Sequence, residues 1–264
     1  MTATNELAPL QAASTRFMAA WLAAMLRPGG TLLRLGDALV ASAPDVPDLD
    51  FPNTVYGLVP DDVGHVRTIV QRARTSGQRP WFEVWPGEGS DELAAALTAA
   101  GAEPTDEHGI YVAGALEERP TPEPPPEMTV DDEPAPAPFA STLLGGLEVP
   151  ASAIERHGAS VQAWATIPGL RRYLLQLDGR PVAAAAMLLD GPVGYLASAG
   201  TLPDSRRQGA HGALVARRLA DAAEAGATMA GSLARPRGAS ARNLERAGLE
   251  FAGVIRRLRL GPPR

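Results

Sequence analysis

One stretch of the sequence combines residue types that bind anions. Residues 200–214 read GTLPDSRRQGAHGAL, in which Arg206 and Arg207 precede a glycine-containing turn and the start of a predicted helix. The first turn of a helix exposes backbone N–H groups and the positive end of the helix dipole. Glycine lets a phosphate group approach that backbone closely. The stretch therefore predicts a site for a phosphate or another anion.

The charge distribution agrees with an anion site in the second half. Residues 1–133 carry a net charge of −13 and residues 134–264 carry +7, within a total of −6. A basic half favours the binding of an anionic ligand there. The alternative is that surface charge follows composition without any ligand.

Missing residue types exclude several functional classes. The sequence has no Cys and no Lys, since all 24 basic residues are Arg. Thiolate nucleophiles, disulfides and Fe–S clusters need Cys, whereas Schiff-base enzymes, phosphate-loop NTPases and protein kinases need Lys. The four His residues show no metal-ligand spacing, so we expect no metal site.

The sequence shows no sign of export or of membrane insertion. It has no run of eighteen apolar residues, and its start, MTATNELAPLQ, lacks the basic and apolar regions of a signal peptide. We therefore expect a cytoplasmic protein without a membrane partner. No basic run with interleaved aromatic residues occurs either, so we expect no nucleic-acid partner.

A proline-rich segment divides the chain. Residues 117–138 read EERPTPEPPPEMTVDDEPAPAP. Proline fixes φ and removes the backbone donor, which leaves room only for a short strand at residues 128–130. At 264 residues, the chain has the length of about two domains of about 150 residues each. We expect domains at 1–119 and 127–264, joined by a linker at 120–126.

The second half reads as strands and helices around the anion-binding stretch. Asp178-Gly179 and Asp190-Gly191 separate three apolar runs and indicate an antiparallel three-strand meander. The meander strands are expected at 171–177, 181–189 and 193–199, and a later pair of strands at 228–233 and 251–260. Helices are expected at 139–145, 151–165, 207–226 and 240–247.

The first half repeats part of this order. Extended segments are expected at 31–43, strands at 54–59, 81–85 and 110–113, and helices at 61–76 and 91–100. Trp81, Phe82 and Trp85 suggest a buried strand face. Strand, helix, strand, helix, strand therefore occurs twice, which suggests a duplicated fold.

The second half resembles the GNAT acetyltransferase superfamily, whose acyl-CoA signature is R/Q-x-x-G-x-G/A between a strand and a helix. Arg206 and Gly209 match this signature, and Pro203 stands where members often carry proline. Residues 240–251, SARNLERAGLEF, are similar to a later helix of the family. The resemblance extends from about residue 127 to residue 260.

The resemblance implies a fold, a reaction and a set of binding residues. The fold would be an α/β fold of two GNAT-like lobes, each with a mixed, mostly antiparallel sheet flanked by helices. The activity would be that of an N-acetyltransferase that moves acetyl from acetyl-CoA to a primary amine by direct attack. The residues expected to bind the cosubstrate are Ala199, Gly200, Thr201, Leu202, Arg206, Arg207, Gln208, Gly209, Ala210, His211, Gly212 and Asn243.

Two positions depart from the family pattern. His211 replaces the second Gly or Ala of the signature; it is either an additional phosphate donor or a side chain exposed to solvent. Leu244 stands where many members place a Tyr that protonates the leaving thiolate. The general acid is therefore unassigned.

The general base is also unassigned. Glu148, Glu155 and His157 lie before the meander, in a region that flanks the acceptor site in the family, and are weak candidates. Asp190 and Asp204 at strand ends are further candidates, and Asp204 reads better as a turn or cap residue. Three aromatic residues either line an acceptor pocket or belong to the core: Trp164, Tyr173 and Tyr195.

The corresponding junction in the first half reads LVPDDVGH, with Asp61 and Asp62 in place of the two Arg residues. Carboxylates repel a diphosphate, so we expect a degenerate first lobe without a CoA site. Two other functions remain open: a non-catalytic acyl-CoA-binding or regulatory protein, and a tRNA-dependent aminoacyl transferase. The acidic first half disfavours the latter. The amine acceptor, the acyl chain length and the oligomeric state are not indicated.

Overall fold

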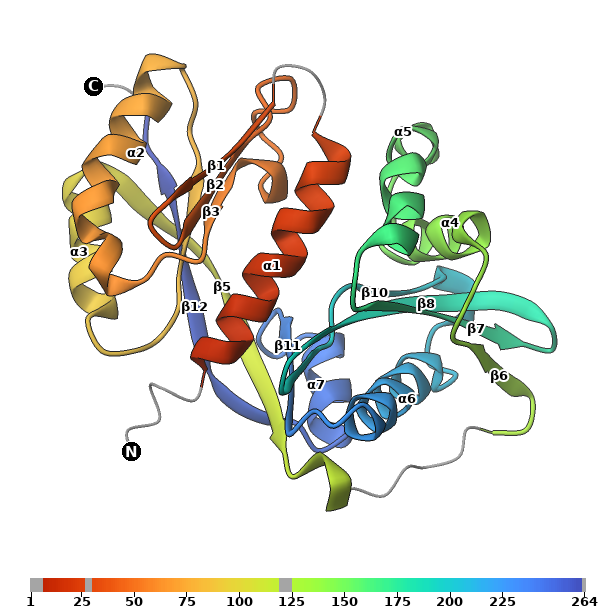
Figure 1. The fold of residues 1–264 in the computed structure, drawn as a ribbon. Coiled ribbons are helices and arrows are strands. Elements are labelled where there is room, and N and C mark those ends of the chain that lie inside the picture. Colours follow the sequence, from red (N-terminus) through yellow and green to blue (C-terminus); the bar gives the residue numbers. More distant parts are fainter. Residues whose placement is uncertain (1–6, 27–29, 119–124, 263–264) are drawn as a thin grey trace. The chain divides into compact units, whose positions relative to one another are not determined.

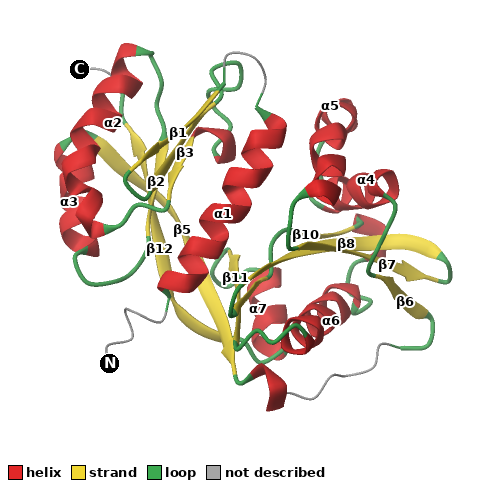
Figure 2. Cartoon of the chain, viewed as in Figure 1, coloured by secondary structure: helices red, strands yellow, loops and turns green. Residues whose placement is uncertain are grey.

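The computed structural model describes residues 7–26, 30–118 and 125–262. The chain divides into two compact units (Figures 1 and 2). Unit 1 comprises Met1–Gly109 and Gly253–Arg264, and unit 2 comprises Ile110–Ala252. Each unit has its own hydrophobic core.

Unit 1 contains a mixed sheet with helices. Its strands follow the order β1-β2-β3-β4-β12-β5. Pairing is antiparallel for β1–β2, β2–β3 and β4–β12. Strands β3 and β4 pair in parallel, and α2 connects them along the chain. The elements are α1 (Ala8–Met25), β1 (Thr31–Leu35), β2 (Ala38–Ser42), β3 (Thr54–Tyr56), α2 (Val63–Thr75), β4 (Trp81–Val84), α3 (Ser90–Ala99), β5 (Ala102–Gly114) and β12 (Glu250–Leu260), with short 3₁₀ turns η2 (Phe51–Asn53) and η3 (Pro60–Asp62).

Helix α1 is the one long element of the described chain that the sequence did not predict. It spans Ala8–Met25, and its N-cap residue Leu7 makes no side-chain capping bond. Buried positions such as Leu10, Phe17 and Leu22 alternate with many alanines, which blur the apolar stripe that identifies a helix. Trp81, Phe82 and Trp85 are buried, as predicted.

Unit 2 is built around a mostly antiparallel sheet. Its strand order is β5-β11-β9-β8-β7-β6, with β10 paired to β8 outside this path. Helices α4 and α5 cover one face, and α6 and α7 cover the other (Figure 1). The elements are η4 (Leu116–Glu118), β6 (Met128–Asp131), α4 (Pro136–Gly146), α5 (Ala151–Gln162), η5 (Ala163–Thr166), β7 (Leu170–Leu177), β8 (Arg180–Asp190), β9 (Val193–Tyr195), β10 (Ala199–Thr201), η6 (Pro203–Ser205), α6 (Ala210–Glu224), β11 (Met229–Ala234) and α7 (Ala239–Arg246).

The third meander strand is broken in two, whereas the sequence predicted one strand at 193–199. Its first part, β9, pairs antiparallel with the end of β8 and parallel with β11. Its second part, β10, pairs with Ala183–Ala185 of β8. Within the described residues, the sheet pairs β10 with β8 alone. Beyond Leu196, whose N–H bonds Gly231 O at 2.8 Å, the chain therefore diverges from β11.

The division into units differs from the predicted domain boundary. Strand β5 contributes residues to both units, and so does β12. The last part of β12 pairs with β4, from Arg256 opposite Val84 to Arg259 opposite Trp81, so the end of the chain completes unit 1. Most of the predicted linker at 120–126 lies outside the described residues. The predicted fold class, a mixed sheet flanked by helices in each half, is confirmed.

Candidate functional site

A cleft of about 840 Å³ opens in unit 2 where β10 leads into α6. Its walls are the β10–α6 loop, the first turn of α6 and the side of α7. Most of the residues predicted to bind a cosubstrate line it: Ala199, Gly200, Thr201, Arg206, Arg207, Gly209, Ala210, His211, Gly212 and Asn243. Leu202 and Gln208 are not among the lining residues, which also include residues that the sequence did not indicate: Gly146, Ser205, Ala239, Ser240, Arg242 and Arg246.

The loop backbone leaves the start of α6 accessible. Arg207 and Gly209 both adopt left-handed conformations, with φ of 66° and 86°. Ala213 N–H bonds Gly209 O at 3.0 Å. The preceding amides of Ala210, His211 and Gly212 therefore have no acceptor within the helix. A Cβ atom added at Gly212 would meet nothing within 4 Å, so this first turn faces open space.

The amides of β10 fall into two sets. Leu202 N–H bonds Val182 O, and Ala186 N–H bonds Ser198 O, both at 2.9 Å. In an antiparallel ladder, alternate residues direct their backbone groups towards the same neighbour. Leu202 therefore donates to β8 and is not available to a ligand. The backbone N–H groups of Ala199 and Thr201 point away from β8, towards the edge where β10 has left β11.

Arg206 is held by protein groups. Its guanidinium donates to Glu148 Oε2 at 3.0 Å and to Gly146 O and Thr201 O at 3.3 Å. These contacts tie the end of α4 to β10. The predicted role of Glu148 as a base is therefore in competition with its ion pair. Arg207, one residue later, is exposed at the cleft.

Two glycines allow α4 to touch β10. A Cβ atom at Gly200 would lie 2.8 Å from Leu143 O, and one at Gly146 would overlap the backbone of Gly200 and Thr201. The helix therefore packs directly on the strand that borders the cleft. The Gly145-Gly146 pair near the end of a helix was the signal in the sequence that could have located this contact.

His211 is half-buried at the cleft and contacts α7. Its Nδ1 lies 3.2 Å from Asn243 Nδ2, and Arg246 donates to Asn243 Oδ1 at 2.7 Å. Burial, together with the positive charge of Arg218, lowers the pKa of His211 to about 4. The side chain is therefore neutral at physiological pH.

Three other candidates from the sequence are not among the described residues that line the cleft. His157 is half-buried in α5, Asp190 ends β8, and Asp204 is exposed in η6. Glu155 also belongs to α5, but its side chain is outside the described residues. Core positions are occupied by Leu244, Trp164, Tyr173 and Tyr195.

A buried arginine stabilises the break between β9 and β10. Arg218 is 1% exposed and donates to Leu214 O at 3.0 Å, Ala186 O at 3.1 Å and Ala197 O at 3.3 Å. Ser232 of β11 donates to Leu196 O at 2.9 Å. Burial lowers the pKa of Arg218 to about 10, so it stays charged. Sequence reasoning missed it because an arginine in a helix is usually exposed.

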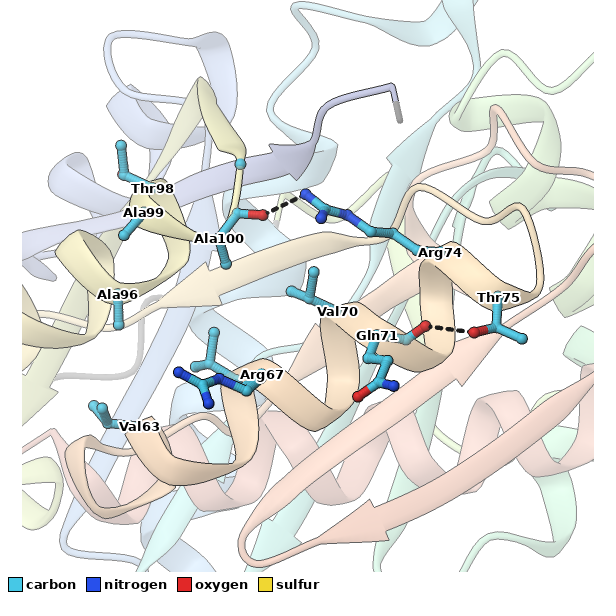
Figure 3. A pocket seen from close by; sticks show the side chains of 12 residues that line it. Val63, Arg67, Val70, Gln71, Arg74, Thr75, Ala96, Thr98, Ala99 and Ala100 are labelled. Carbon is cyan, nitrogen blue, oxygen red and sulfur yellow. Dashed lines mark hydrogen bonds between the residues drawn. The ribbon is translucent and has the colours of Figure 1, made fainter. Parts of the chain in front are cut away.

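A second hollow, of about 800 Å³, lies in unit 1 between α2 and α3 (Figure 3). Arg67, Val70 and Arg74 of α2 line it, and Arg74 donates to Ala100 O at 2.7 Å. It runs beside α2, and neither Asp61 nor Asp62 at the start of that helix is among its lining residues. This hollow therefore lacks the loop amides that distinguish the cleft of unit 2.

Comparison with known proteins finds a family match within the second half. Residues 152–233 match the family model of the acetyltransferase (GNAT) domain, a range that includes β10, the loop and α6. Among curated protein sequences, none matches the chain significantly.

Several solved structures share the fold at low sequence identity. A tandem GNAT protein from the clavulanic acid biosynthesis pathway has a TM-score of 0.64 and 16% identity, over 100% of this chain and 98% of that one. A GCN5-related N-acetyltransferase from Kribbella flavida has a TM-score of 0.61 and 19% identity, over 94% and 96%. One from Sphaerobacter thermophilus has 0.60 and 16%, over 86% and 81%. The predicted resemblance to the GNAT superfamily in its tandem form is confirmed. Within the described residues, no helix is long and apolar enough to cross a membrane.

Proposed function

We propose, from the premise that the second half carries a GNAT acetyltransferase domain, that this protein moves an acetyl group from acetyl-CoA to a primary amine. The observation that carries this proposal is the cleft at the start of α6. Ten of the twelve residues predicted for cosubstrate binding line that cleft.

In this proposal, the start of α6 binds the diphosphate of acetyl-CoA. The free amides of Ala210, His211 and Gly212 converge at the positive end of the helix dipole. The left-handed Gly209 sets the direction of these amides, and Arg207 supplies a charge at the edge. Arg206 contributes indirectly, because its bonds hold β10 against α4.

The thioester is proposed to lie along the open edge of β10. There the outward N–H groups of Ala199 and Thr201 are available to polarise the thioester carbonyl. The amine nitrogen attacks the carbonyl carbon, a C–N bond forms, and the C–S bond breaks with its electron pair on sulfur. No covalent enzyme intermediate is needed.

The attacking amine must first lose a proton. An alkylammonium of pKa about 10.4 costs about 4.6 kcal/mol to deprotonate at pH 7. None of the carboxylates of the described residues lines the cleft, so we propose that ordered water carries this proton away. The departing thiolate, with an ordinary thiol pKa of about 8.5, takes a proton from water without a side-chain acid. Leu244 at the usual Tyr position is compatible with that route.

A second candidate function is supported by the same observations. Leu244 is buried and no carboxylate of the described residues lines the cleft, which would suit a protein that binds acyl-CoA without transferring the acyl group. The two functions share the cosubstrate and differ in turnover.

Two measurements separate these functions. Isothermal titration with acetyl-CoA should show saturable binding below millimolar concentration; its absence would exclude both. Thiol release from acetyl-CoA in the presence of a panel of primary amines should then exceed the rate without amine. Binding without amine-dependent release would favour the non-catalytic protein.

A further inference from the structure

Three side chains form a hydrogen-bonded chain on the wall of the cleft. Arg246 NH1 donates to Asn243 Oδ1 at 2.7 Å, and Asn243 Nδ2 lies 3.2 Å from His211 Nδ1. Arg246 and Asn243 are one turn apart on α7, whereas His211 belongs to the first turn of α6. All three residues line the cleft.

These three hydrogen-bonded side chains determine which nitrogen of His211 carries the proton. A guanidinium only donates, so Arg246 fixes the Asn243 amide with its oxygen towards α7 and its NH₂ towards His211. The NH₂ group also only donates, so Nδ1 of His211 must accept. A neutral imidazole that accepts at Nδ1 carries its hydrogen on Nε2.

We propose that His211 is an uncharged donor held by Asn243 and Arg246, and that its Nε2–H binds a phosphate oxygen of the acyl-CoA in this cleft. The identity of the ligand rests on the proposed function. Asn243 and Arg246 act as positioning residues, because they reach the ligand only through the imidazole.

The surroundings of His211 favour a neutral donor. Among the described residues, the charged side chains that line the cleft with it are cationic: Arg206 and Arg207 from the loop, and Arg242 and Arg246 from α7. On its own helix, the buried Arg218 adds a further positive charge, and burial with this charge lowers the pKa of His211 to about 4. Within the described residues, the carboxylate bound to a member of this group is Glu148, which pairs with Arg206. A second proton on the imidazole would be repelled by these arginines and would meet the NH₂ of Asn243.

The tautomer of His211 can be measured on the free protein, without a ligand and without an activity assay. We expect ¹H–¹⁵N correlation spectra of the free protein to show His211 as the Nε2–H tautomer, with no titration between about pH 5 and about pH 8. Only four histidines are present, so His211→Gln identifies its signals by their loss. A protonated ring at neutral pH, or the Nδ1–H tautomer, would overturn the proposal.

Replacing the amide by a carboxylate should reverse the arrangement. In Asn243→Asp, the carboxylate accepts from Nδ1–H, so His211 is expected to gain a proton and to titrate within the neutral range. An unchanged His211 spectrum in this variant would show that Asn243 does not control the imidazole.

The contact with the ligand is tested by titration of the full chain with CoA. Removal of a hydrogen bond to a charged group weakens binding by about 10- to 100-fold, and we expect this loss for His211→Ala. His211→Gln, whose amide can donate, should recover most of the affinity. His108→Ala in unit 1 is the matched control and should bind CoA as the wild type does.

The outcomes distinguish this proposal from the proposed function. If the wild type binds CoA and His211→Ala binds it equally well, the donor role is wrong and the CoA site stands. If the wild type binds no CoA, the proposed function fails, and the donor role fails with it. The Nε2–H tautomer would then describe only the packing of α6 against α7.

Discussion

The start of α2 in unit 1 and the start of α6 in unit 2 follow the same element order and differ in chemistry. At α2, Asp62 is buried, its Oδ2 accepts from Val59 N–H at 3.2 Å, and its Oδ1 lies 3.1 Å from His65 Nδ1. The turn at Gly36 between β1 and β2 lies so close that a Cβ atom there would overlap Asp62 Oδ1. The start of α2 is therefore occupied by a carboxylate and covered by a hairpin.

At α6, the corresponding position is Gly209, and the first turn faces open space at Gly212. Both helices present free amides and a positive dipole end, because all helices do. The difference lies in the charge beside them: in unit 1 the carboxylate of Asp62 stands at the N-cap without a side-chain bond to the helix amides, and in the proposed function of unit 2 an external anion binds there. A strand followed by a helix therefore supplies a potential anion site at the helix start, and a few residues decide whether an anion can bind there.

The strongest test of this comparison transfers the carboxylate of unit 1 to unit 2. Gly209→Asp places a negative charge beside the proposed diphosphate. Two unit charges about 4 Å apart near a protein surface interact by about 4 kcal/mol, or about a thousandfold in Kd. We expect acetyl-CoA binding, measured by isothermal titration, to fall by about that factor.

Gly209→Ala is the control for this change. It imposes the same left-handed strain at φ 86°, which costs about 1 kcal/mol, but adds no charge. Binding that weakens equally in both variants would show that the backbone, and not the charge, decides whether this turn accepts an anion.

Each unit also buries an arginine, but with different acceptors. In unit 1, Arg257 NH2 bonds Asp50 at 2.9 Å and its NH1 bonds Asp106 at 3.0 Å, while Glu83 Oε1 lies 3.9 Å from Nε. Burial raises the pKa of Glu83 to about 7, Arg257 opposes this shift, and Asp50 and Asp106 add to it. Unit 2 instead buries Arg218, with backbone carbonyls as its acceptors.

We predict that Glu83 makes unit 1 less stable as the pH rises. The folded-state pKa, about 7, lies above the ordinary value of 4.5. The folded state therefore binds the proton more tightly, and this stabilisation is complete below about pH 4.5 and lost as the pH rises through about 7. Relative to Glu83→Gln, the free energy of unfolding of the wild type should fall by up to about 3 kcal/mol between about pH 4.5 and about pH 8.

Denaturant titrations of both proteins at both pH values measure this difference. Glu88→Gln, at an exposed loop position outside this cluster, serves as the control. A difference between wild type and Glu83→Gln that is independent of pH would contradict a protonated Glu83 in the folded protein.

A smaller effect is expected from opening the start of α2. Asp62→Ala removes the acceptor of Val59 N–H and the partner of His65, which should cost about 2 kcal/mol of stability. It should not create a second site for acetyl-CoA, because the turn at Gly36 still covers the helix end. Denaturation gives the first quantity, and the stoichiometry of titration gives the second.

Asp62→Asn separates the two contributions. Its amide oxygen can still accept from Val59 N–H, so most of the stability should remain. A gain of acetyl-CoA stoichiometry in either variant would show that the carboxylate alone, without the hairpin, keeps unit 1 from binding the ligand.

Much of the cleft could be predicted because its signals are local. The Arg206–Gly212 turn, the helix after it and the Asp-Gly hairpins each depend on neighbours in the sequence, and the structure places them together. The sequence also shows a contrast between the junctions, with Asp61 and Asp62 set against Arg206 and Arg207, whereas the structure makes Gly209 the equivalent of Asp62, because each is the N-cap of its helix.

The features that were missed depend on residues far apart in the chain. The break between β9 and β10 needs Arg218 and Ser232 to satisfy carbonyls at 196 and 197, and no local pattern announces such partners. The last residues of the chain belong to unit 1 because Arg256–Arg259 pair with β4, which lies far away in the sequence. Arg206 lines the cleft, and the sequence did not indicate that its side chain also bonds the end of α4, 60 residues earlier.

The contacts of Arg206 lead to the prediction with the smallest expected change in activity. Arg206 and Glu148 form an ion pair at 3.0 Å with side chains 42% and 63% exposed, and such pairs contribute about 0.5 kcal/mol. Glu148→Gln leaves the bonds of Arg206 to Gly146 O and Thr201 O intact. We therefore expect kcat to change by less than about threefold, with the same pH profile of the rate.

Glu224→Gln, at the exposed end of α6, is the matched control. A large loss of kcat together with loss of the acidic limb of the pH profile, where the rate falls as a base is protonated, would instead make Glu148 the base; the proton of the amine would then leave through a side chain beside Arg206 and not through water.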